Sequence, residues 1–334
     1  MPIFDQFNRP LRDLRISVTD RCNFRCTYCM PKEIFDKNHH FLRKEKLLSF
    51  EEIYRLASIL VELGIRKIRL TGGEPLMRRQ LERLIEMLAT LPNVDLSLTT
   101  NGSFPIQRVQ SLKDAGLNRI TVSLDALDDA IFKAMNDVEF PVERVLKWVD
   151  ACRDAGFAPV KINMVVQRGV NDQSILPMAY HFKDRANILR FIEYMDVGSS
   201  NGWRMDDVVS AAEICSIIQS EMPIEAIEPS YRGEVAKRWR YKDGGGEVGF
   251  IASVTQAFCR DCTRLRLSAD GSLYTCLFAA NGHDLRGLLR ENASDKEISE
   301  SISSIWQART DRYSEIRSAE TMPVRKVEMS YIGG

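Results

Sequence analysis

Short β-branched or apolar runs alternate with amphipathic helical stretches over the first two-thirds of this chain. This alternation is typical of repeated βα units over a parallel sheet. Strands are expected at about residues 13–18, 67–71, 95–99, 118–124, 160–166 and 188–193. Six units are fewer than the eight of a closed barrel, so we expect an α/β fold, an incomplete (β/α)6 TIM-type barrel with its chemistry at the carboxyl ends of the strands. A flavodoxin-like sheet is the alternative.

Local signals mark where the intervening helices begin and end. Ser49 with Glu52 three residues later forms a capping-box pattern before an apolar helical face, and Gly64 follows that face. Pro141 and Gly156 bracket a later helix in the same way. These signals support the alternation of helices and strands.

The composition is that of a globular protein, with 44% hydrophobic and 28% charged residues among 334. Lysine plus arginine (46) equals aspartate plus glutamate (46), which disfavours a general DNA or membrane-surface binder. The sequence has no uncharged apolar stretch of about 18 residues and no signal-peptide core near its start. We therefore expect a cytoplasmic protein that binds neither DNA nor a membrane.

The strand–helix alternation ends at about residue 196, and an irregular pattern begins at about residue 225. We expect a partial barrel over residues 1–225 and a C-terminal subdomain over residues 226–334. The last four residues, 331–334, are expected to form a small flexible tail.

Six of the eight cysteines fall into two groups, which in a reducing compartment suggests metal or iron–sulfur ligation. Cys22, Cys26 and Cys29 have the spacing Cys-x3-Cys-x2-Cys directly after the first expected strand. Three thiolates without a fourth nearby suit a cubane cluster with one open iron. A zinc site with a distant ligand, or unrelated thiols, are the alternatives.

The second group has the spacing Cys259-x2-Cys262-x13-Cys276. His283 lies seven residues further on and could complete a Cys3His zinc site. Spacing alone leaves zinc and iron–sulfur ligation equally open. The other two cysteines, Cys152 and Cys215, lie at apolar helical positions and are expected to be buried core thiols.

Several basic residues fall where a barrel would bury them. An isolated buried cation is costly unless it is paired or liganded, and arginine binds phosphate in a bidentate manner. A triphosphate would satisfy such a set, and individual salt bridges are the alternative. The residues are Arg15, Lys67, Arg69, Lys161 and Arg190 on expected strands, with Arg264 and Arg266 after the second cysteine pair.

Two motifs together resemble the radical S-adenosylmethionine (SAM) superfamily. One is the first cysteine group with Tyr28 before its last cysteine, and the other is Thr71-Gly72-Gly73-Glu74-Pro75 at the second strand end. The resemblance implies a [4Fe-4S] cluster whose open iron binds SAM and, when reduced, cleaves it to a 5′-deoxyadenosyl radical. Glycines would expose backbone to the closely approaching ligand.

The second cysteine group with Thr263-Arg264-Leu265-Arg266 resembles the GTP 3′,8-cyclase family of molybdenum-cofactor biosynthesis. Further matches run from residues 9–15, through Arg190-Phe191-Ile192-Glu193, to the terminal Gly333-Gly334. The resemblance implies a second [4Fe-4S] cluster, GTP as substrate and 3′,8-cyclo-7,8-dihydro-GTP as product. It also implies an electron donor, a pterin-forming enzyme (cyclic pyranopterin monophosphate synthase) that accepts the product, a homodimer, and terminal glycines that enter the active site.

The resemblance also assigns roles to individual residues. The cluster ligands are Cys22, Cys26 and Cys29 for the first cluster and Cys259, Cys262 and Cys276 for the second. The SAM contacts are Tyr28, Gly73, Ser123 and Met195. The GTP contacts are Arg15, Arg69, Thr99, Lys161, Arg264 and Arg266, with Arg190 as a weaker addition. The catalytic set is Cys22, Cys26, Cys29, Arg15, Arg264 and Arg266.

Three other functions compete with this one. A different radical SAM enzyme with an auxiliary cluster, such as a peptide-modifying one, would ignore GTP. A non-enzymatic iron–sulfur redox protein would not consume SAM. A zinc-stapled regulatory module would contain zinc and little iron.

Overall fold

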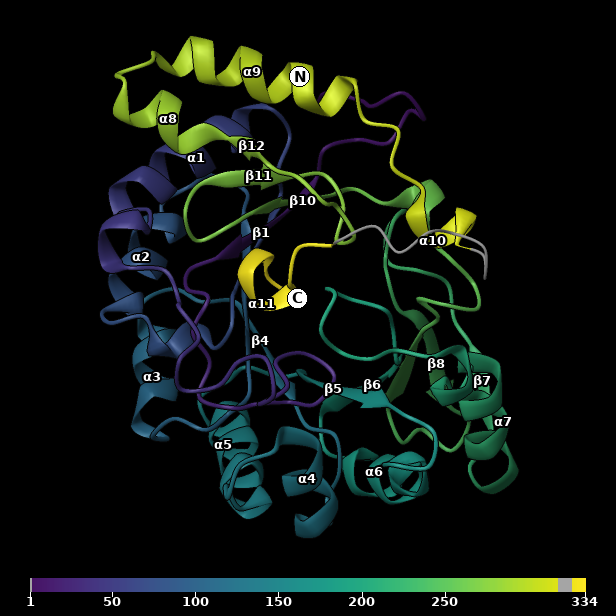
Figure 1. The fold of residues 1–334 in the computed structure, drawn as a ribbon. Coiled ribbons are helices and arrows are strands. Elements are labelled where there is room, and N and C mark those ends of the chain that lie inside the picture. The colour runs from purple at the N-terminus through teal and green to yellow at the C-terminus, as the bar shows by residue number, and fades with distance from the viewer. Residues whose placement is uncertain (1, 318–325) are drawn as a thin grey trace.

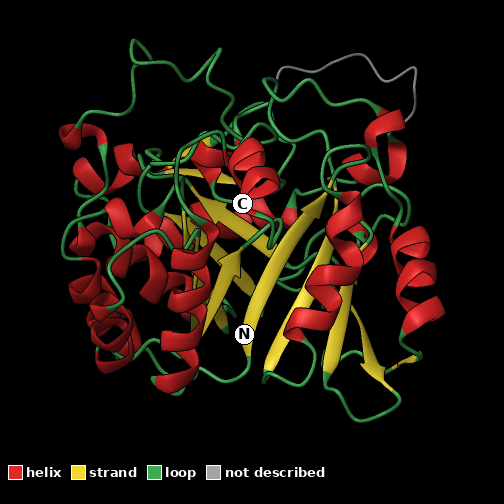
Figure 2. Ribbon diagram, turned by 90° about the horizontal axis from the view of Figure 1, so that it is seen from below, coloured by secondary structure: helices red, strands yellow, loops and turns green. Residues whose placement is uncertain are grey.

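The computed structural model describes residues 2–317 and 326–334 of the chain. In these residues a single twelve-stranded sheet has the order β12-β11-β10-β1-β2-β3-β4-β5-β6-β9-β8-β7. The sheet curves, with most helices on its outer side, and the C-terminus lies toward the interior (Figure 1). Figure 2 shows the strands fanning out inside the layer of helices.

The six predicted strands are present and form consecutive parallel neighbours. Their sequential order is that of a singly wound barrel wall, so the incomplete-barrel prediction is confirmed and the flavodoxin-like alternative is wrong. Their bounds are β1 (Asp13–Ser17), β2 (Lys67–Thr71), β3 (Asp95–Thr100), β4 (Arg119–Ser123), β5 (Val160–Val166) and β6 (Asn187–Glu193).

The C-terminal part of the chain extends both edges of this wall. Strand β9 (Glu247–Ile251) pairs in parallel with β6, and β10 (Arg264–Leu267) pairs in parallel with β1. Four antiparallel strands lie outside them: β7 (Ile224–Ala226), β8 (Lys237–Tyr241), β11 (Ser272–Tyr274) and β12 (His283–Asp284). The segments on the two sides of residue 225 therefore share one sheet. The division into two domains at this residue stays a prediction.

The helices follow the predicted local signals. Ser49 and Glu52 form the capping box of the first helix, and Gly64 after it has φ +121°. Pro141 is the N-cap of α5. The helices are α1 (Phe50–Glu62), α2 (Leu81–Ala89), α3 (Gln107–Asp114), α4 (Asp129–Asn136), α5 (Val142–Asp154), α6 (Ile175–Phe182), α7 (Ala211–Glu221), α8 (Leu285–Arg290), α9 (Asp295–Gln307), α10 (Tyr313–Ile316) and α11 (Met329–Ile332).

The apolar helix faces pack on the sheet to form one core. Cys152 on α5 is fully buried, as predicted, whereas Cys215 on α7 is only partly buried against that core. In the described residues, no helix combines the length and apolarity that crossing a membrane requires.

The predicted flexible tail at residues 331–334 is wrong. Residues 329–332 form the helical turn α11, and Ile332 is fully buried. Burial of apolar side chains in this turn anchors the end of the chain to the rest of the protein. Position near a terminus does not predict such an anchor.

Candidate active site

One cavity of about 600 Å³ opens inside the barrel wall. All the predicted SAM, GTP and cysteine-ligand residues line it, although they come from segments across the whole chain. The cavity extends along the inner face of the sheet, from the amino ends of the strands, where Lys161 and Arg264 lie, to the carboxyl ends, where Gly73 follows β2.

The first cysteine loop leaves the end of β1 and packs against α4. The backbone N–H groups of Arg25 and Thr27 donate to the carbonyl oxygens of Asn136 and Met135 at 2.9 and 3.0 Å. The Arg25 guanidinium donates to the Cys22 carbonyl at 2.8 Å, which fixes the loop from its own side. The loop is therefore held in place by protein contacts that do not involve a cluster.

Cys22, Cys26 and Cys29 all line the cavity. Burial, followed by the charge of Glu74, raises the pKa of Cys22 to about 12, and burial also raises the pKa values of Cys26 and Cys29. In the described residues, no three cysteine, histidine or acidic side chains are arranged to hold a single metal ion. Three thiols from one loop, facing one cavity, do suit a larger iron–sulfur cluster, which deprotonates its thiols on binding.

The Gly72-Gly73-Glu74 turn packs directly on this loop. The Gly73 and Glu74 N–H groups donate to the carbonyl oxygens of Thr19 and Arg21 at 2.9 and 2.8 Å. A Cβ on Gly72 or on Gly73 would come within 2.3 Å of the same two oxygens. The glycines are thus required for close contact between two backbone segments. From the sequence, we expected them only to expose backbone to a ligand.

Glu74 is buried and connects two strand ends. Its carboxylate accepts hydrogen bonds from the Leu76 N–H, the Thr100 hydroxyl and the Asn101 N–H at 3.0, 2.8 and 2.8 Å. Burial raises the pKa of Glu74 to about 7, while these donors oppose the shift. The carboxylate therefore fixes the geometry at the ends of β2 and β3 beside the cysteine loop.

The predicted SAM contacts Tyr28, Ser123 and Met195 lie on the cavity wall together with Gly73. The Tyr28 hydroxyl donates to Asp125 at 2.8 Å, and Asn201 donates to the carbonyl oxygens of Tyr28 and Met195 at 3.3 and 3.0 Å. Sequence reasoning gave no role to Asn201, because the turn that carries it meets Tyr28 only in the fold.

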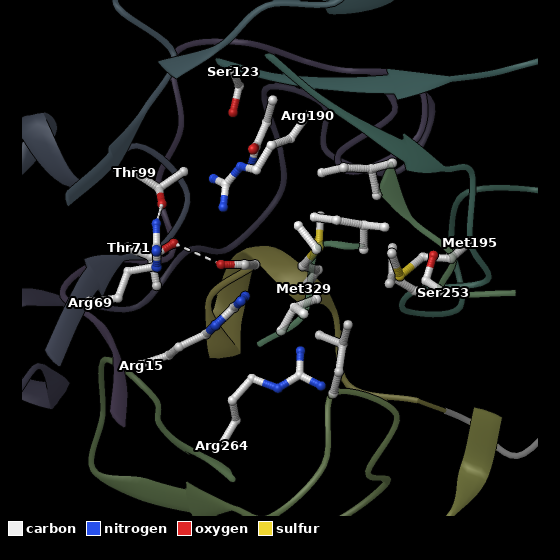
Figure 3. Close-up of a pocket in the computed structure, with 18 of the residues that line it drawn as sticks. Arg15, Arg69, Thr71, Thr99, Ser123, Arg190, Met195, Ser253, Arg264 and Met329 are labelled. Carbon is white, nitrogen blue, oxygen red and sulfur yellow. Dashed lines mark hydrogen bonds between the residues drawn. The ribbon is translucent and has the colours of Figure 1, made fainter. Parts of the chain in front are cut away.

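The predicted GTP contacts form a buried cationic wall. Arg15 on β1 is in register with Arg69 on β2 and with Arg266 on β10. Figure 3 shows Arg15, Arg69, Arg190 and Arg264 extending into the same space. Parallel pairing places these side chains on one face because their strands start in matched register.

Within the described residues, none of the predicted GTP-contact cations takes part in an ion pair, so the salt-bridge alternative is not what the structure has. Arg69 donates to the hydroxyls of Thr99 and Thr121, at 2.9 and 3.1 Å. Burial, with nearby arginines next, lowers the pKa of Lys161 to about 7 and of Arg190 to about 9. A cationic wall without acidic partners is a binding surface for a polyanion.

Asn163 is a cavity-lining residue that sequence reasoning missed. It lies on β5, in register with Ser123 on β4 and Arg190 on β6, and its Oδ1 is buried with no hydrogen-bond partner among the described residues. Its position between the predicted SAM and GTP contacts gives it access to a bound ligand. The alternation of side chains along β5, with Lys161 two residues earlier, was the signal that could have identified it.

The second cysteine group lies across the cavity from the first, with Cys259 and Cys262 at a short turn before β10 and Cys276 after β11. Burial raises the pKa of Cys262, but the charges of Arg264 and Arg309 outweigh it and lower that pKa to about 6. His283 is exposed on β12 and lies outside the cavity lining, which disfavours the Cys3His zinc arrangement.

The C-terminus enters this cavity, as the resemblance implied. The Gly333 carbonyl accepts a hydrogen bond from Arg266, and Gly334 lines the cavity. Gly333 has φ +80°, and a Cβ there would approach the Thr71 side chain to 2.3 Å. Only glycine fits both the backbone conformation and the space.

Comparison with known proteins identifies the class. Residues 16–179 match the family model of the radical SAM superfamily, and residues 187–315 match that of Molybdenum Cofactor Synthesis C. The structure resembles Streptococcus suis SuiB bound to S-adenosylmethionine (TM-score 0.61, 15% identity, 90% of this chain and 69% of that chain). SuiB bound to its precursor peptide SuiA gives a TM-score of 0.63 at 13% identity over 98% and 72% of the two chains, a likeness of fold. The fold and the first model together define a radical SAM enzyme.

Curated relatives identify the family within this class. The GTP 3′,8-cyclase of Acidothermus cellulolyticus is 55% identical over 359 residues, covering 100% of this chain and 99% of that protein. The GTP 3′,8-cyclase of Staphylococcus carnosus is 51% identical over 337 residues, covering 99% of each. The chain belongs to the GTP 3′,8-cyclase family.

Proposed function

We propose that this enzyme converts GTP to 3′,8-cyclo-7,8-dihydro-GTP in the first step of molybdenum-cofactor biosynthesis. The observation that carries the proposal is the buried wall of cations between the two cysteine groups in one cavity, which within the described residues have no carboxylate partners. The names of the curated relatives agree with this substrate.

Two [4Fe-4S] clusters and SAM would supply an electron and a 5′-deoxyadenosyl radical that removes the C3′ hydrogen of GTP before C8 is attacked. We assign the first cluster to Cys22, Cys26 and Cys29, and the second to Cys259, Cys262 and Cys276 beside the guanine. Tyr28, Gly73, Ser123 and Met195 would then contact SAM.

The protein's own contribution is placement. Arg15, Arg69, Lys161, Arg264 and Arg266 would bind the triphosphate, with Thr99 and Arg190 beside them. Because these cations are buried and fixed by the strands, they orient the ribose without rearrangement. The position of the cavity inside the barrel wall would limit access of water to the reacting atoms.

Specific observations argue against two of the competing functions. A peptide-modifying enzyme, the class to which the SuiA-binding neighbour points, has no need of several buried cations without carboxylate partners in the described residues. A zinc-stapled module would need a fourth ligand, and His283 is exposed away from the cavity. An electron-transfer protein would bind neither SAM nor GTP.

The partners and location remain predictions. We expect a one-electron donor, transfer of the product to cyclic pyranopterin monophosphate synthase, a homodimer and a place in the cytoplasm.

The test of the proposed function is an anaerobic assay. The protein is reconstituted with iron and sulfide, given SAM and dithionite, and its 5′-deoxyadenosine is quantified with GTP, with ATP and without nucleotide. We expect strong stimulation by GTP alone. Equal slow cleavage in all three samples would contradict GTP as substrate, and no cleavage with two full clusters would contradict an enzyme.

The lowered pKa of Lys161 predicts that GTP binding depends on pH. Burial, followed by the charge of Arg190, lowers the pKa of this amine to about 7 in the free cavity. Above pH 7 the amine is largely neutral, so binding of the anion must take up a proton. Affinity should therefore fall as the pH rises from about 7.5 to 9, by at most about tenfold per pH unit.

Calorimetric titration of GTP in two buffers of different ionisation enthalpy measures the proton uptake directly. Lys161→Met should abolish most of the uptake at pH 8.5. Lys147→Met, which removes an exposed lysine paired with Glu143 on α5, is the matched control and should change nothing. Unchanged uptake in Lys161→Met would show that this amine does not meet the triphosphate.

A further inference from the structure

A buried charged network contacts the second cysteine group from outside its loop, and one of its members, Arg309, also lines the cavity. It consists of Asp5 and Arg9, which precede β1, and Arg309, which follows α9. No more than 1% of any of the three side chains is exposed. We call these three residues the Asp5–Arg9–Arg309 network. None of them belongs to the predicted SAM, GTP or cluster-ligand sets.

Arg309 contacts one cysteine of the second group twice. Its Nη2 donates to the Cys262 sulfur at 3.3 Å, and its Nη1 donates to the Cys262 carbonyl oxygen at 2.8 Å. Its Nε donates to Asp311 at 3.2 Å, and its guanidinium lies 4.6 Å from the centroid of the Trp306 ring. These contacts leave the guanidinium a single orientation, directed at the sulfur.

Arg9 holds the other end of the same loop. Its Nη1 donates to the carbonyl oxygens of Cys259 and Asp311 at 2.7 and 2.9 Å. The Trp306 indole N–H donates to the Arg9 carbonyl at 3.2 Å. The N-terminal segment therefore ties the cysteine loop to the end of α9.

Asp5 is the anion shared by the two arginines. Its carboxylate accepts from Arg9 Nε and from Arg309 Nη1, and also from the backbone N–H groups of Phe7 and Arg9. The Asp311 carboxylate, which pairs with Arg309 Nε, is a second anion, so the two guanidinium groups of the network face two carboxylates. Arg264 adds a third guanidinium, whose Nη2 donates to the Cys262 sulfur at 3.3 Å.

Excess positive charge in a buried site is costly unless an anion balances it. The Cys262 sulfur is the acceptor on which Arg264 and Arg309 meet. A thiolate bound to iron remains anionic, and the cluster gains a further negative charge when it is reduced. Hydrogen bonds to its sulfur therefore stabilise the reduced form more than the oxidised form.

We propose that the Asp5–Arg9–Arg309 network is the outer shell of the second iron–sulfur cluster and sets its reduction potential. The proposal rests on the proposed function, in which the second cysteine group ligates a [4Fe-4S] cluster. Arg309 positions Cys262 and stabilises the reduced cluster, Arg9 positions Cys259, and Asp5 limits the positive charge. The single electron involved comes from an external one-electron donor.

The experiment isolates the second cluster. Cys22, Cys26 and Cys29 are replaced with alanine to give a parent protein, which is reconstituted anaerobically with iron and sulfide. Iron content, the electron paramagnetic resonance spectrum and the midpoint potential are then measured with dithionite as reductant. Arg309→Met and Asp5→Asn are compared with this parent, with Arg309→Lys as the conservative variant.

The two variants should move the potential in opposite directions. Arg309→Met should lower the ratio of reduced to oxidised cluster at least about tenfold at the parent's midpoint potential, a shift of about 59 mV for one electron. Asp5→Asn should raise this ratio, because it leaves the arginine charge unbalanced. Arg309→Lys should lie between parent and Arg309→Met. Arg108→Met, which removes a partly exposed arginine paired with Glu82, is the control and should leave potential and spectrum unchanged.

The outcomes separate this inference from the proposed function. If the parent protein binds no iron, the second cluster is contradicted, and this inference is contradicted as well. A parent with a full cluster whose potential and spectrum are the same in both variants would overturn this inference alone. Loss of iron in Arg309→Met and Arg309→Lys, at an unchanged melting temperature of the protein, would support the positioning of Cys262. If Arg309→Met does not fold, the midpoint potentials and electron paramagnetic resonance spectra of Asp5→Asn and Arg309→Lys test the inference instead.

Discussion

Replacing Cys26 with alanine should abolish the formation of 5′-deoxyadenosine from SAM, lowering its rate by well over 100-fold. Changes in residues that only support metal ligands cost about 10- to 100-fold, and loss of a ligand exceeds this. Cys26 is the central thiol of the first loop and lines the cavity, where the proposed cluster would bind. The measurement is 5′-deoxyadenosine per minute per enzyme after anaerobic reconstitution, together with iron content.

Cys152→Ala is the matched control, because Cys152 is also a buried thiol but lies on α5 outside the cavity lining. It should retain both the iron content and the rate. Full SAM cleavage by Cys26→Ala would reject the assignment of the first cluster to this loop.

Replacing Cys262 with alanine separates the two halves of the reaction. The first loop and its contacts lie across the cavity, so SAM cleavage without GTP should continue near the parent rate. Formation of the cyclised GTP product should fall by more than about 100-fold, because the proposed second cluster would lose a ligand and Arg264 and Arg309 would lose the sulfur to which both donate. Chromatographic quantification of product and of 5′-deoxyadenosine in one reaction gives both rates.

Cys215→Ala is the control for this variant, since its thiol is partly buried on α7 away from both cysteine groups. Normal product formation by Cys262→Ala would exclude a role for the second group in GTP chemistry. Loss of SAM cleavage in the same variant would instead show that the two cysteine groups do not act independently.

The local features of the fold were predictable from sequence because neighbouring residues determine them. The capping box of Ser49 and Glu52 satisfies backbone N–H groups within one helical turn. The strand β5, with its alternation of buried and half-buried residues, has the same bounds in sequence and structure. The first cysteine group is likewise compact, so its spacing alone indicates shared ligation.

The edges of the sheet were not predictable in this way. Strand β10 is four residues long and contains Arg264 and Arg266, which gives no apolar run to identify it. Its parallel pairing with β1 joins segments about 250 residues apart and places Arg266 beside Arg15. Only the folded sheet makes an arginine a favourable residue at this position, because it faces the cavity rather than the core.

The sequence by itself thus determined the repeating βα units, the helix caps, both cysteine groups and the family to which they belong. The tertiary structure decided which distant groups meet: Arg266 with Gly333, Asn163 with the open cavity, and Arg309 with Cys262. The physical reason is the range of the interactions. Hydrogen bonds and apolar periodicity within an element leave a pattern in neighbouring residues, whereas buried charges are balanced by partners that only long-range packing brings into contact.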